Sequence, residues 1–500
     1  MPAVAYSDSE DAKEGECEND FMPKIILIQI NFSRDHAEKI LPLGILSVGS
    51  ALKKNGFNVE LLNINEKEID KTAGYIIGER PLFLGFSVMT GIQTKHSAEL
   101  SKKIKAGSDI KILWGGIHPS LLPEQCLKEE YIDLLAMGEG EETVVELAQR
   151  MENKEPLSGL LGLGYKDDGN VYLNPERPLI KSLDEWPMDF SLLPMDKYVY
   201  KLDRYERVIA YKASRGCPFN CAFCYNRFFN KNRWRAWSVS RVVKDIEYLK
   251  ENYKIDAVKF YDDNFFVDKS RALEILRRIN LPSHLEVRID MIDDELAKEL
   301  KERKIFDLLI GVESGSDRIL AMINKKITVE RVIAAVKSLA KYDVPASYSA
   351  IVGLPGESKK EFEATIDLLY KIYKIHPKSA ITLGAYMPYP GSQMYEMAIE
   401  AGFKPPVKTE DWGKIDRFRK DFSSPWVDGN KVWRIREYFK LLKIKLGPVN
   451  KWFEFRLQHR FFACPLDIYL VEWLAGIAIE EKNWFGKLLR KGYNFLKNKL

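Results

Sequence analysis

Short β-rich runs alternate with amphipathic stretches along most of this 500-residue chain, and this alternation limits the fold more than any other feature. Alternating strands and helices predict parallel sheets with helices packed on both faces. The run 82–86, Leu-Phe-Leu-Gly-Phe, contains no polar side chain, as expected for a strand that is buried on both faces. The predicted fold class is therefore α/β.

The first series of strands and helices covers residues 23–155 and predicts one α/β domain. Its expected strands lie at 25–30, 58–62, 82–87 and 111–114, and its expected helices at 44–55 and 97–106. Residues 156–205 have little helical periodicity and contain several prolines, at 175, 178, 187 and 194. This segment is expected to be an irregular linker that lies over the surface.

A second series covers residues 206–405. Its expected strands begin at Val208 and continue near 257–261, 285–289, 308–312, 347–352 and 381–385. These strand–helix units are fewer than the eight of a complete barrel, so we expect a partial (β/α)6 barrel. Residues 406–500 are rich in Trp, Phe, Lys and Arg at helical spacing, which predicts a helical C-terminal domain.

The composition excludes several classes of protein. Lys and Arg total 76 against 72 Asp and Glu, and this small net charge does not indicate nucleic acid as a main partner. Six cysteines are too few for a secreted disulfide framework. No apolar run is long enough to span a membrane, and residues 1–22 are acidic, unlike a signal peptide. We expect a cytoplasmic protein with a disordered acidic leader over residues 1–22.

Three cysteines within eight residues give the strongest chemical signal. Cys217, Cys221 and Cys224 directly follow a predicted strand and the turn-like segment 214–216. Structural zinc prefers four protein ligands, and the sequence offers no fourth cysteine or obvious histidine nearby. An iron–sulfur cluster with three thiolates keeps one iron open for a substrate or cofactor. We therefore favour a cluster over zinc and over three buried thiols without metal.

This CxxxCxxC spacing, with Phe223 before the last cysteine, resembles the signature of the radical S-adenosylmethionine (SAM) enzymes. The resemblance covers about residues 205–405. It implies a [4Fe-4S] cluster whose open iron chelates the amino and carboxylate groups of SAM. One electron then cleaves SAM to methionine and a 5′-deoxyadenosyl radical, which abstracts a hydrogen atom from an unactivated carbon. The electron donor is expected to be a ferredoxin or flavodoxin.

The resemblance also implies SAM contacts at the ends of later strands. Asp263 and Asn264 offer acceptors for the methionine amino group, although their segment departs from the commoner Gly-Gly-Glu form. Arg288 is a candidate partner for the methionine carboxylate, because a guanidinium grips a carboxylate with two hydrogen bonds. An exposed arginine at the strand end, in a surface ion pair, is the equally weighted alternative.

Two further segments resemble cofactor contacts of the family. Glu313 and Ser314, within 311–316, are expected near the ribose and methionine ends, while a helix cap at residue 316 or 317 is the alternative. Gly353 and Glu357, within 351–357, are expected near the adenine, although Gly-Leu-Pro-Gly alone predicts only a turn.

Residues 40–145 resemble the Rossmann-like cobalamin-binding domain that precedes the barrel in one large class of these enzymes. The matching segments are 42–46, 85–90, 114–119 and 137–143, and they place Ser87, Thr90, Gly115, Gly116, His118, Gly138 and Glu139 among the expected cobalamin contacts. Glycines at the carboxyl ends of parallel strands let the backbone approach a large ligand. The Asp-x-His-x-x-Gly motif of cobalamin mutases is absent from the sequence, and the class generally lacks it. A domain that keeps this fold without corrinoid is the alternative.

Three side chains of this domain are candidates for ligation or catalysis, but the sequence favours structural roles for them. His118 precedes Pro119 in a turn, where hydrogen bonding or packing is more usual than axial ligation of cobalt. Glu139 and Glu141 lie on a glycine turn that opens a helix, which favours capping and loop shape over catalysis. No catalytic residue is predicted beyond the cofactor ligands. The remaining cysteines, at 17, 126 and 464, are interpreted as structural thiols or as part of the leader.

The C-terminal residues suggest contact with a membrane surface. Apolar side chains at 485, 488, 489 and 496 recur at helical spacing among basic residues, a pattern typical of an interfacial helix on an anionic membrane. A helix packed on the barrel explains the same pattern equally well. The membrane interpretation would place the protein at the inner surface of the membrane and would suggest a lipid or isoprenoid substrate.

Together, the resemblances imply a radical SAM enzyme that uses cobalamin to methylate an unactivated carbon of a small-molecule or lipid substrate. One SAM would methylate the cobalt, and another would supply the radical that activates the substrate carbon. The alternative within the enzyme class is radical cyclisation or carbon–carbon coupling without corrinoid. A methylthiotransferase acting on RNA is less favoured, since the first domain lacks an additional cysteine cluster. A non-catalytic iron–sulfur and corrinoid sensor or carrier is the alternative from another class.

Overall fold

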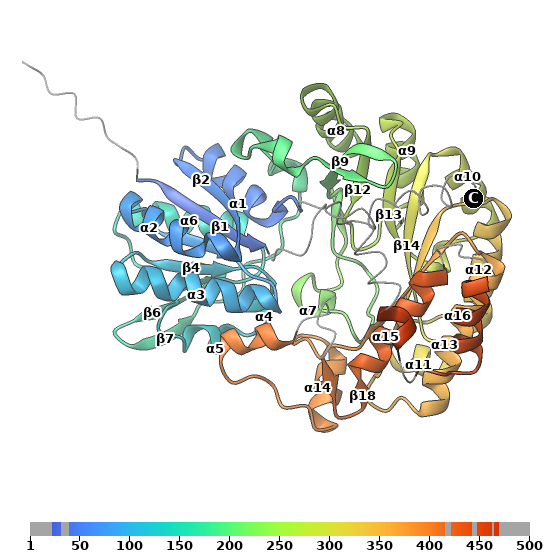
Figure 1. The fold of residues 1–500 in the computed structure, drawn as a ribbon. Coiled ribbons are helices and arrows are strands. Elements are labelled where there is room, and N and C mark those ends of the chain that lie inside the picture. Colours follow the sequence, from blue (N-terminus) through green and yellow to red (C-terminus); the bar gives the residue numbers. More distant parts are fainter. Residues whose placement is uncertain (1–22, 32–39, 416–421, 443–447, 463–464, 470–500) are drawn as a thin grey trace, which may run out of the picture.

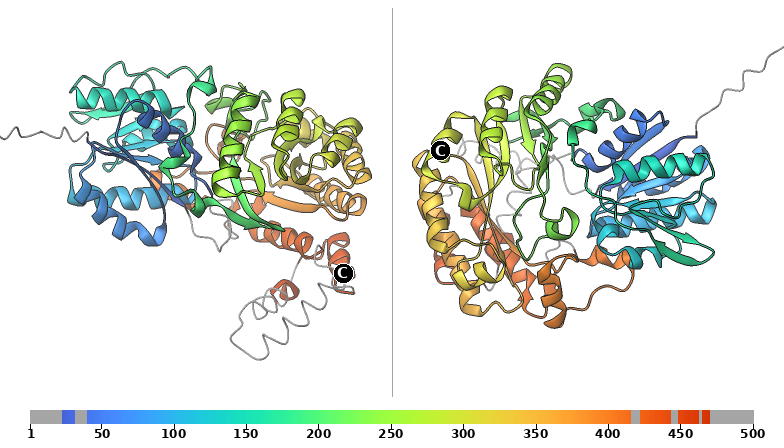
Figure 2. Two further views of the ribbon diagram at one scale, coloured as in Figure 1. Left: turned by 90° about the horizontal axis from the view of Figure 1, so that it is seen from above. Right: turned by 180° about the vertical axis from the view of Figure 1, so that it is seen from behind.

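The computed structural model describes residues 23–31, 40–415, 422–442, 448–462 and 465–469. Within these residues two α/β units lie side by side, followed by a helical C-terminal region (Figures 1 and 2). The predicted fold class is therefore confirmed. The leader, Cys17, Cys464 and the apolar residues of 485–496 lie outside the described residues.

The first unit is built on a sheet in the order β2-β1-β3-β4-β5-β6-β7. Strands β1 (Ile25–Asn31), β2 (Val59–Asn65), β3 (Leu84–Ser87), β4 (Ile112–Gly115) and β5 (Leu134–Ala136) run parallel. Alternate residues of β1 enter two different cores, with Ile25 and Leu27 in one and Ile26 and Ile28 in the other. The sheet is thus buried on both faces, as the sequence predicted.

Helices cover both faces of this sheet. Helices α1 (Leu43–Lys54) and α6 (Gly140–Glu152) contribute buried residues to the core on one face. Helices α2 (Ile69–Glu79) and α3 (Ile92–Gly107) contribute to the core on the other face. Two short helices, α4 (Ile117–Leu121) and α5 (Pro123–Leu127), follow β4. The layers are therefore helix, sheet and helix.

The segment 156–205 differs from the expected surface linker. Strands β6 (Leu163–Asp167) and β7 (Asn170–Leu173) form an antiparallel hairpin that extends the first sheet beyond β5. After the hairpin, apolar residues from Ile180 to Tyr198 are buried in the core that also contains the second unit. The prolines keep this segment irregular, but its apolar side chains place it between the two units rather than over them.

The second unit is a partial barrel in the order β16-β15-β14-β13-β12-β9-β8. The strands β9 (Tyr205–Tyr211), β12 (Ala257–Phe260), β13 (Ser283–Arg288), β14 (Ile305–Glu313), β15 (Ala346–Val352) and β16 (Ala380–Ala385) are parallel, and β8 (Tyr200–Leu202) pairs antiparallel with β9. All six predicted barrel strands are therefore present. The sheet curves but stays open in Figure 1.

Helices surround the outer face of the partial barrel in Figure 1. They are α8 (Val239–Tyr253), α9 (Lys269–Ile279), α10 (Asp294–Glu302), α11 (Asp317–Met322), α12 (Val329–Lys341) and α13 (Lys359–Ile375). A small hairpin, β10 (Ser214–Arg215) with β11 (Arg235–Ala236), brackets the segment that contains the three cysteines and α7 (Asn226–Phe229). The carboxyl ends of both parallel sheets thus carry the segments that the sequence marked as functional.

The C-terminal region connects the two units. After α14 (Gln393–Glu400) the chain returns to the first unit (orange in Figure 1), where the 3₁₀ helix η6 (Thr409–Lys414) packs on α3. Trp412 is fully buried there, and its Nε1 donates to Gln125 Oε1 at 2.8 Å. Helices α15 (Gly429–Leu442) and α16 (Pro448–Gln458) follow a short hairpin of β17 (Ser423–Ser424) and β18 (Val427–Asp428). Among the described helices, none combines the length and apolar character that a bilayer crossing requires.

Candidate active site

The three cysteines lie on a loop, residues 216–224, which we call the cluster loop. Asn226 closes this loop, because its Oδ1 accepts from the Cys217 N–H at 3.1 Å and its Nδ2 donates to the Cys217 carbonyl. The backbone N–H of Asn226 also donates to Cys224 Sγ at 3.5 Å. Asn226 is buried, and the sequence analysis did not single it out. Its only signal in the sequence is its position two residues after the last cysteine.

The first residue of the cluster loop is fixed more tightly than the rest. Gly216 has a φ of +78°, and a Cβ atom there would lie 2.1 Å from the carbonyl oxygen of Arg233. Only glycine fits such a backbone position. The Gly216 N–H donates to Asp263 Oδ2 at 3.0 Å. The carboxyl end of β12 therefore anchors the beginning of the loop.

The donor set fits an iron–sulfur cluster better than zinc. Burial raises the pKa of the Cys217 thiol, and it raises the pKa of Cys224 to about 12. The loop offers three thiols, one short of the four ligands that structural zinc prefers. In a [4Fe-4S] cluster with three protein ligands, each thiolate binds a different iron. The cluster predicted from the sequence is consistent with this arrangement.

Arg288 ends β13 next to the cluster loop. Its guanidinium donates to Cys221 Sγ at 3.2 Å and lies 3.8 Å from the centre of the Phe219 ring. It also pairs with Asp290, with Nε and Oδ1 3.0 Å apart, and donates to the carbonyl of Lys325 at 2.8 Å. Arg288 is only 6% exposed, so the alternative of an exposed surface pair does not describe it. The structure places this cation at the cluster site.

A buried ion pair lies behind the cluster loop. Lys325 Nζ is 2.6 Å from Glu313 Oε1, both side chains are buried, and Glu313 has a φ of +63°. Lys325 Nζ also lies 5.9 Å from the centre of the Phe223 ring. Sequence reasoning found Glu313 and Phe223 but missed Lys325, because a lysine beside another lysine in a loop is usually solvated. Its burial is visible only in the fold.

Asn264 presents an acceptor that the protein does not satisfy. The side chain is fully buried, and its Nδ2 lies 3.4 Å from Met291 Sδ. Its Oδ1 has no hydrogen-bond partner among the described residues. Buried polar atoms without a partner are rare and need an explanation. The neighbouring Asp263 is already used by Gly216, so Asn264 is the better acceptor for an ammonium group.

The segment 311–316, at the end of β14, contacts the outer helices of the partial barrel. The Ser314 hydroxyl lies 3.2 Å from Thr365 Oγ1 on α13, on the outer layer of the partial barrel. Ser316 caps α11 by accepting from the Ile319 N–H, so the capping alternative holds for that residue. The structure therefore turns Ser314 toward a helix.

Gly353 and Glu357 form a closed turn after β15. Glu357 Oε2 accepts the N–H groups of Gly353 and Leu354, and its Oε1 has no partner in the described part of the chain. The Gly353 carbonyl accepts from Trp426 Nε1 at 2.6 Å. Burial raises the pKa of Glu357 to about 7. The C-terminal region thus covers the turn that the sequence assigned to adenine.

The carboxyl ends of β3 and β4 meet at the proposed cobalamin edge of the first sheet. Gly115 and Ser87 pair in register, and Gly116, with a φ of +95°, lies so close to Val88 that a Cβ would be 3.0 Å from its carbonyl oxygen. Thr90 Oγ1 lies 3.0 Å from His118 Nδ1. The left-handed backbone and the close approach of Val88 favour glycine at Gly116, whereas a Cβ at Gly115 would meet only ordinary contacts.

His118 is buried within this edge. Burial lowers its pKa to about 3, so the ring is neutral. Its Nε2 has no partner among the residues described, and Trp412 packs edge-on with ring centres 5.8 Å apart. The His118 ring is thus enclosed by Thr90 and Trp412, and one of its nitrogens is left unsatisfied.

Glu139 and Glu141 bind two arginines of the second unit. Glu139 Oε1 lies 2.7 Å from Arg215 Nη1, and its Oε2 lies 2.6 Å from Arg235 Nη1. Glu141 pairs with Arg215 and accepts from the Ser47 hydroxyl at 2.6 Å. Burial alone would raise the pKa of Glu141, but Arg215 holds it below its ordinary value. These carboxylates bind across the unit boundary rather than capping α6.

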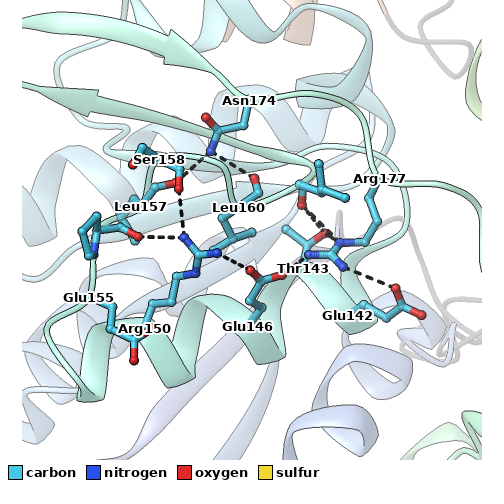
Figure 3. Close-up of polar contacts among 12 residues, drawn as sticks. Glu142, Thr143, Glu146, Arg150, Glu155, Leu157, Ser158, Leu160, Asn174 and Arg177 are labelled. Carbon is cyan, nitrogen blue, oxygen red and sulfur yellow. Dashed lines mark hydrogen bonds and ion pairs between the residues drawn. The ribbon is translucent and has the colours of Figure 1, made fainter.

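The neighbouring turn and the far end of α6 have their own contacts. The Gly138 N–H donates to Ser120 Oγ at 2.9 Å, and Gly138 has a φ of +77°. Further along α6, Glu146 bridges Arg150 and Arg177, and Arg150 donates to two carbonyls of the segment after α6 (Figure 3). This second network joins α6 to the 156–177 segment within the first unit.

Comparisons with known proteins agree with this architecture. The model of the radical SAM superfamily matches residues 211–369, and the model of the B12 binding domain matches residues 36–148. The chain is 37% identical over 324 residues to an uncharacterized methyltransferase of Pyrococcus horikoshii, covering 63% of this chain and 68% of that protein. It is 25% identical over 395 residues to the anaerobic magnesium-protoporphyrin IX monomethyl ester cyclase of Rubrivivax gelatinosus, covering 75% and 69%.

A solved structure shares the fold. The radical SAM methyltransferase TsrM from Kitasatospora setae, solved with cobalamin and a [4Fe-4S] cluster, superposes with a TM-score of 0.61 at 19% identity, over 77% of this chain and 79% of that one. The fold and the cluster loop define a radical SAM enzyme. The chain belongs to the radical SAM family that carries an N-terminal B12-binding domain. Its cofactors are a [4Fe-4S] cluster, SAM and cobalamin.

The turn at Glu357 gives a pH-dependent prediction. Its pKa of about 7 in the folded protein lies above the ordinary 4.5, so this carboxyl contributes stability at low pH that is lost as pH rises through 7. We expect Glu357→Gln to flatten the fall in melting temperature between about pH 5 and about pH 8. Thermal unfolding at both pH values measures this, with the exposed Glu302→Gln as control. Parallel profiles for Glu357→Gln and the wild type would contradict the assignment.

Proposed function

We propose that this protein is a cobalamin-dependent radical SAM methyltransferase that acts on an unactivated carbon. The observation that carries this proposal is the direct connection between the two cofactor regions: Arg215, immediately before the cluster loop, pairs with Glu139 and Glu141 at the B12-binding edge. When bound, the cofactors supply a radical from SAM and a transferable methyl group. The substrate is a small molecule, and turnover requires an external electron donor.

The chain's own residues have separate tasks in this proposal. Cys217, Cys221 and Cys224 hold the cluster. Arg288, whose forked edge already binds Asp290, balances the negative charge of the cluster from 3.2 Å away from Cys221 Sγ. Asn264 Oδ1 accepts from the SAM amino group, which satisfies its unpartnered oxygen.

The other candidates form the remaining walls of the site. SAM is flanked by Glu313, which pairs with Lys325, and by the turn from Gly353 to Glu357. Ser314 instead contacts Thr365 of α13. On the opposite side the residues 87–90, 115–118 and 138–139 face the corrinoid, with glycines that allow backbone approach. The buried His118, which packs against Trp412, supports the corrinoid edge.

Radical cyclisation or coupling is the second candidate function. It is favoured by the 25% identity to the magnesium-protoporphyrin cyclase of Rubrivivax gelatinosus. The methyltransferase proposal is preferred because the more similar of these two relatives is named a methyltransferase and because the model of the B12 binding domain matches residues 36–148.

We also propose a peripheral membrane contact, a lipid substrate and an electron donor of the ferredoxin or flavodoxin type. The apolar side chains of Trp452, Phe455, Phe461 and Leu466 are exposed on α16 and just after it, and Leu466 is 72% exposed. Exposed apolar side chains of this kind suit a lipid surface. The cytoplasmic location expected from the sequence remains a prediction.

The proposed function predicts two products from SAM without any methyl acceptor. Protein reconstituted with iron, sulfide and hydroxocobalamin should hold about four irons per chain. Under reducing conditions it should form S-adenosylhomocysteine, in an amount equal to the bound corrinoid, together with 5′-deoxyadenosine. Cys221→Ala should lose only 5′-deoxyadenosine, and Cys126→Ala is the control. Formation of 5′-deoxyadenosine alone would instead support cyclisation or coupling.

The unpartnered oxygen of Asn264 predicts a specific loss of SAM affinity. Asn264→Leu removes the acceptor at similar volume, and we expect the apparent KM for SAM in 5′-deoxyadenosine formation to rise about 10- to 100-fold, as for other losses of a charge-assisted hydrogen bond. The iron content should not change. An unaltered KM would show that Asn264 does not contact SAM.

The membrane proposal predicts binding to anionic vesicles. The full-length protein should sediment with phosphatidylserine-containing vesicles and less with phosphatidylcholine vesicles, because its aromatic and basic side chains act together. Phe455→Ser combined with Phe461→Ser should weaken the binding. Equal recovery in the supernatant with both kinds of vesicle would contradict it.

A further inference from the structure

Arg215 connects the two units directly beside the cluster loop. It is the last residue before the cluster loop, and its side chain crosses to the first unit, where Nη2 donates to Ser47 Oγ at 3.0 Å and to Glu141. Its Nη1 donates to Glu139 at 2.7 Å. The Glu141 side chain is 3% exposed and that of Arg215 is 16% exposed. The contacts are therefore shielded from water. A buried ion pair is stable only when each of its charges has a partner.

One carboxylate clamps both ends of the segment that contains the cluster loop. Glu139 binds Arg215 of β10 and Arg235 of β11, and these two residues are register partners in the hairpin. The Arg215 guanidinium also lies 5.3 Å from the centre of the Trp237 ring, just after β11. The hairpin that brackets the cluster loop is thus fixed from the opposite unit.

The chain between this clamp and the first cysteine is short and stiff. Gly216 alone separates Arg215 from Cys217, and its Cα has no room for a side chain because the Arg233 carbonyl would lie 2.1 Å from a Cβ. Its N–H is also tied to Asp263 Oδ2 at 3.0 Å. A shift of the Arg215 backbone must therefore move Cys217.

We propose that Arg215 is a positioning residue through which the B12-binding domain sets the geometry of the cluster loop. Glu141 and Ser47 act on SAM cleavage only through Arg215, since they touch neither the cysteines nor the SAM residues assigned above. Supporting partners of this kind orient metal ligands in many sites. Because Glu139 and Glu141 belong to the segment 137–143 assigned to cobalamin, the state of that edge reaches the cluster. The inference rests on the cluster site of the proposed function and not on methyl transfer.

The test compares two identical changes in one helix. Glu141→Gln removes a carboxylate charge that faces Arg215, whereas Glu146→Gln removes one that faces Arg150 and Arg177 within the first unit (Figure 3). Full-length protein carrying each change is reconstituted with iron and sulfide. We expect both variants to retain the iron content of the wild type. The apparent KM for SAM in 5′-deoxyadenosine formation should rise about 10- to 100-fold in Glu141→Gln only.

The electron paramagnetic resonance spectrum of the reduced cluster gives a readout that general destabilisation does not move. We expect the spectral change on adding SAM to be weakened in Glu141→Gln and unaltered in Glu146→Gln. Equal behaviour of the two variants, in either direction, would overturn the inference. If Glu141→Gln fails to fold, Ser47→Ala replaces it, because this change removes one hydroxyl and leaves every charge in place.

A double-mutant cycle tests the route through Arg215. Arg215→Lys keeps the charge but loses the forked contact with both carboxylates. If Glu141 acts through Arg215, the double variant Glu141→Gln with Arg215→Lys should have the same KM for SAM as Arg215→Lys alone. If the two residues act independently, the two increases in KM would multiply. Multiplied effects would overturn the inference. Since the readouts are SAM cleavage and the cluster spectrum, an absence of methyl transfer would refute the proposed function and leave this result unaffected.

Discussion

Four buried charges determine how the two halves of this protein meet. Glu139 and Glu141 of the first unit face Arg215 and Arg235 of the second, and each carboxylate reaches at least one arginine. Charges taken out of water are tolerated only when each finds its partner, so the pairing fixes the relative placement of the units. The apolar residues between Ile180 and Tyr198 fill the remaining space and merge the two cores into one.

This placement brings together two sheet edges with the same chemistry. In parallel sheets the carboxyl ends of neighbouring strands lie at one edge, where the loops are free to bind ligands. The first sheet offers glycines at the ends of β3, β4 and β5, and the second offers the cluster loop and the ends of β12, β13 and β14. The boundary network connects the two edges, because it ends directly at the cluster loop. A large cofactor and a small one can therefore be held from opposite sides.

Some buried polar atoms without a protein partner lie in segments that the sequence assigned to cofactors. Asn264 Oδ1, His118 Nε2 and Glu357 Oε1 are all buried and unpartnered within the described residues, and all lie in segments assigned to cofactors. Folded proteins rarely leave such atoms unsatisfied. By contrast, Asp263, Glu313 and Ser314 already bind protein groups. Protein groups thus already occupy some of the predicted cofactor residues, whereas others keep one atom unsatisfied.

The sequence by itself determined the fold class, the six barrel strands and the cluster cysteines, because doubly buried strands and closely spaced thiols leave a local pattern. It could not reveal the β6–β7 hairpin, since β7 is exposed along its length and carries no alternating pattern. The roles of Asn226, Lys325 and Arg215 were also invisible, because each depends on partners far away in the fold or on burial. Only the tertiary structure decided which charges are removed from water and paired, and that pairing joins the two units at the site.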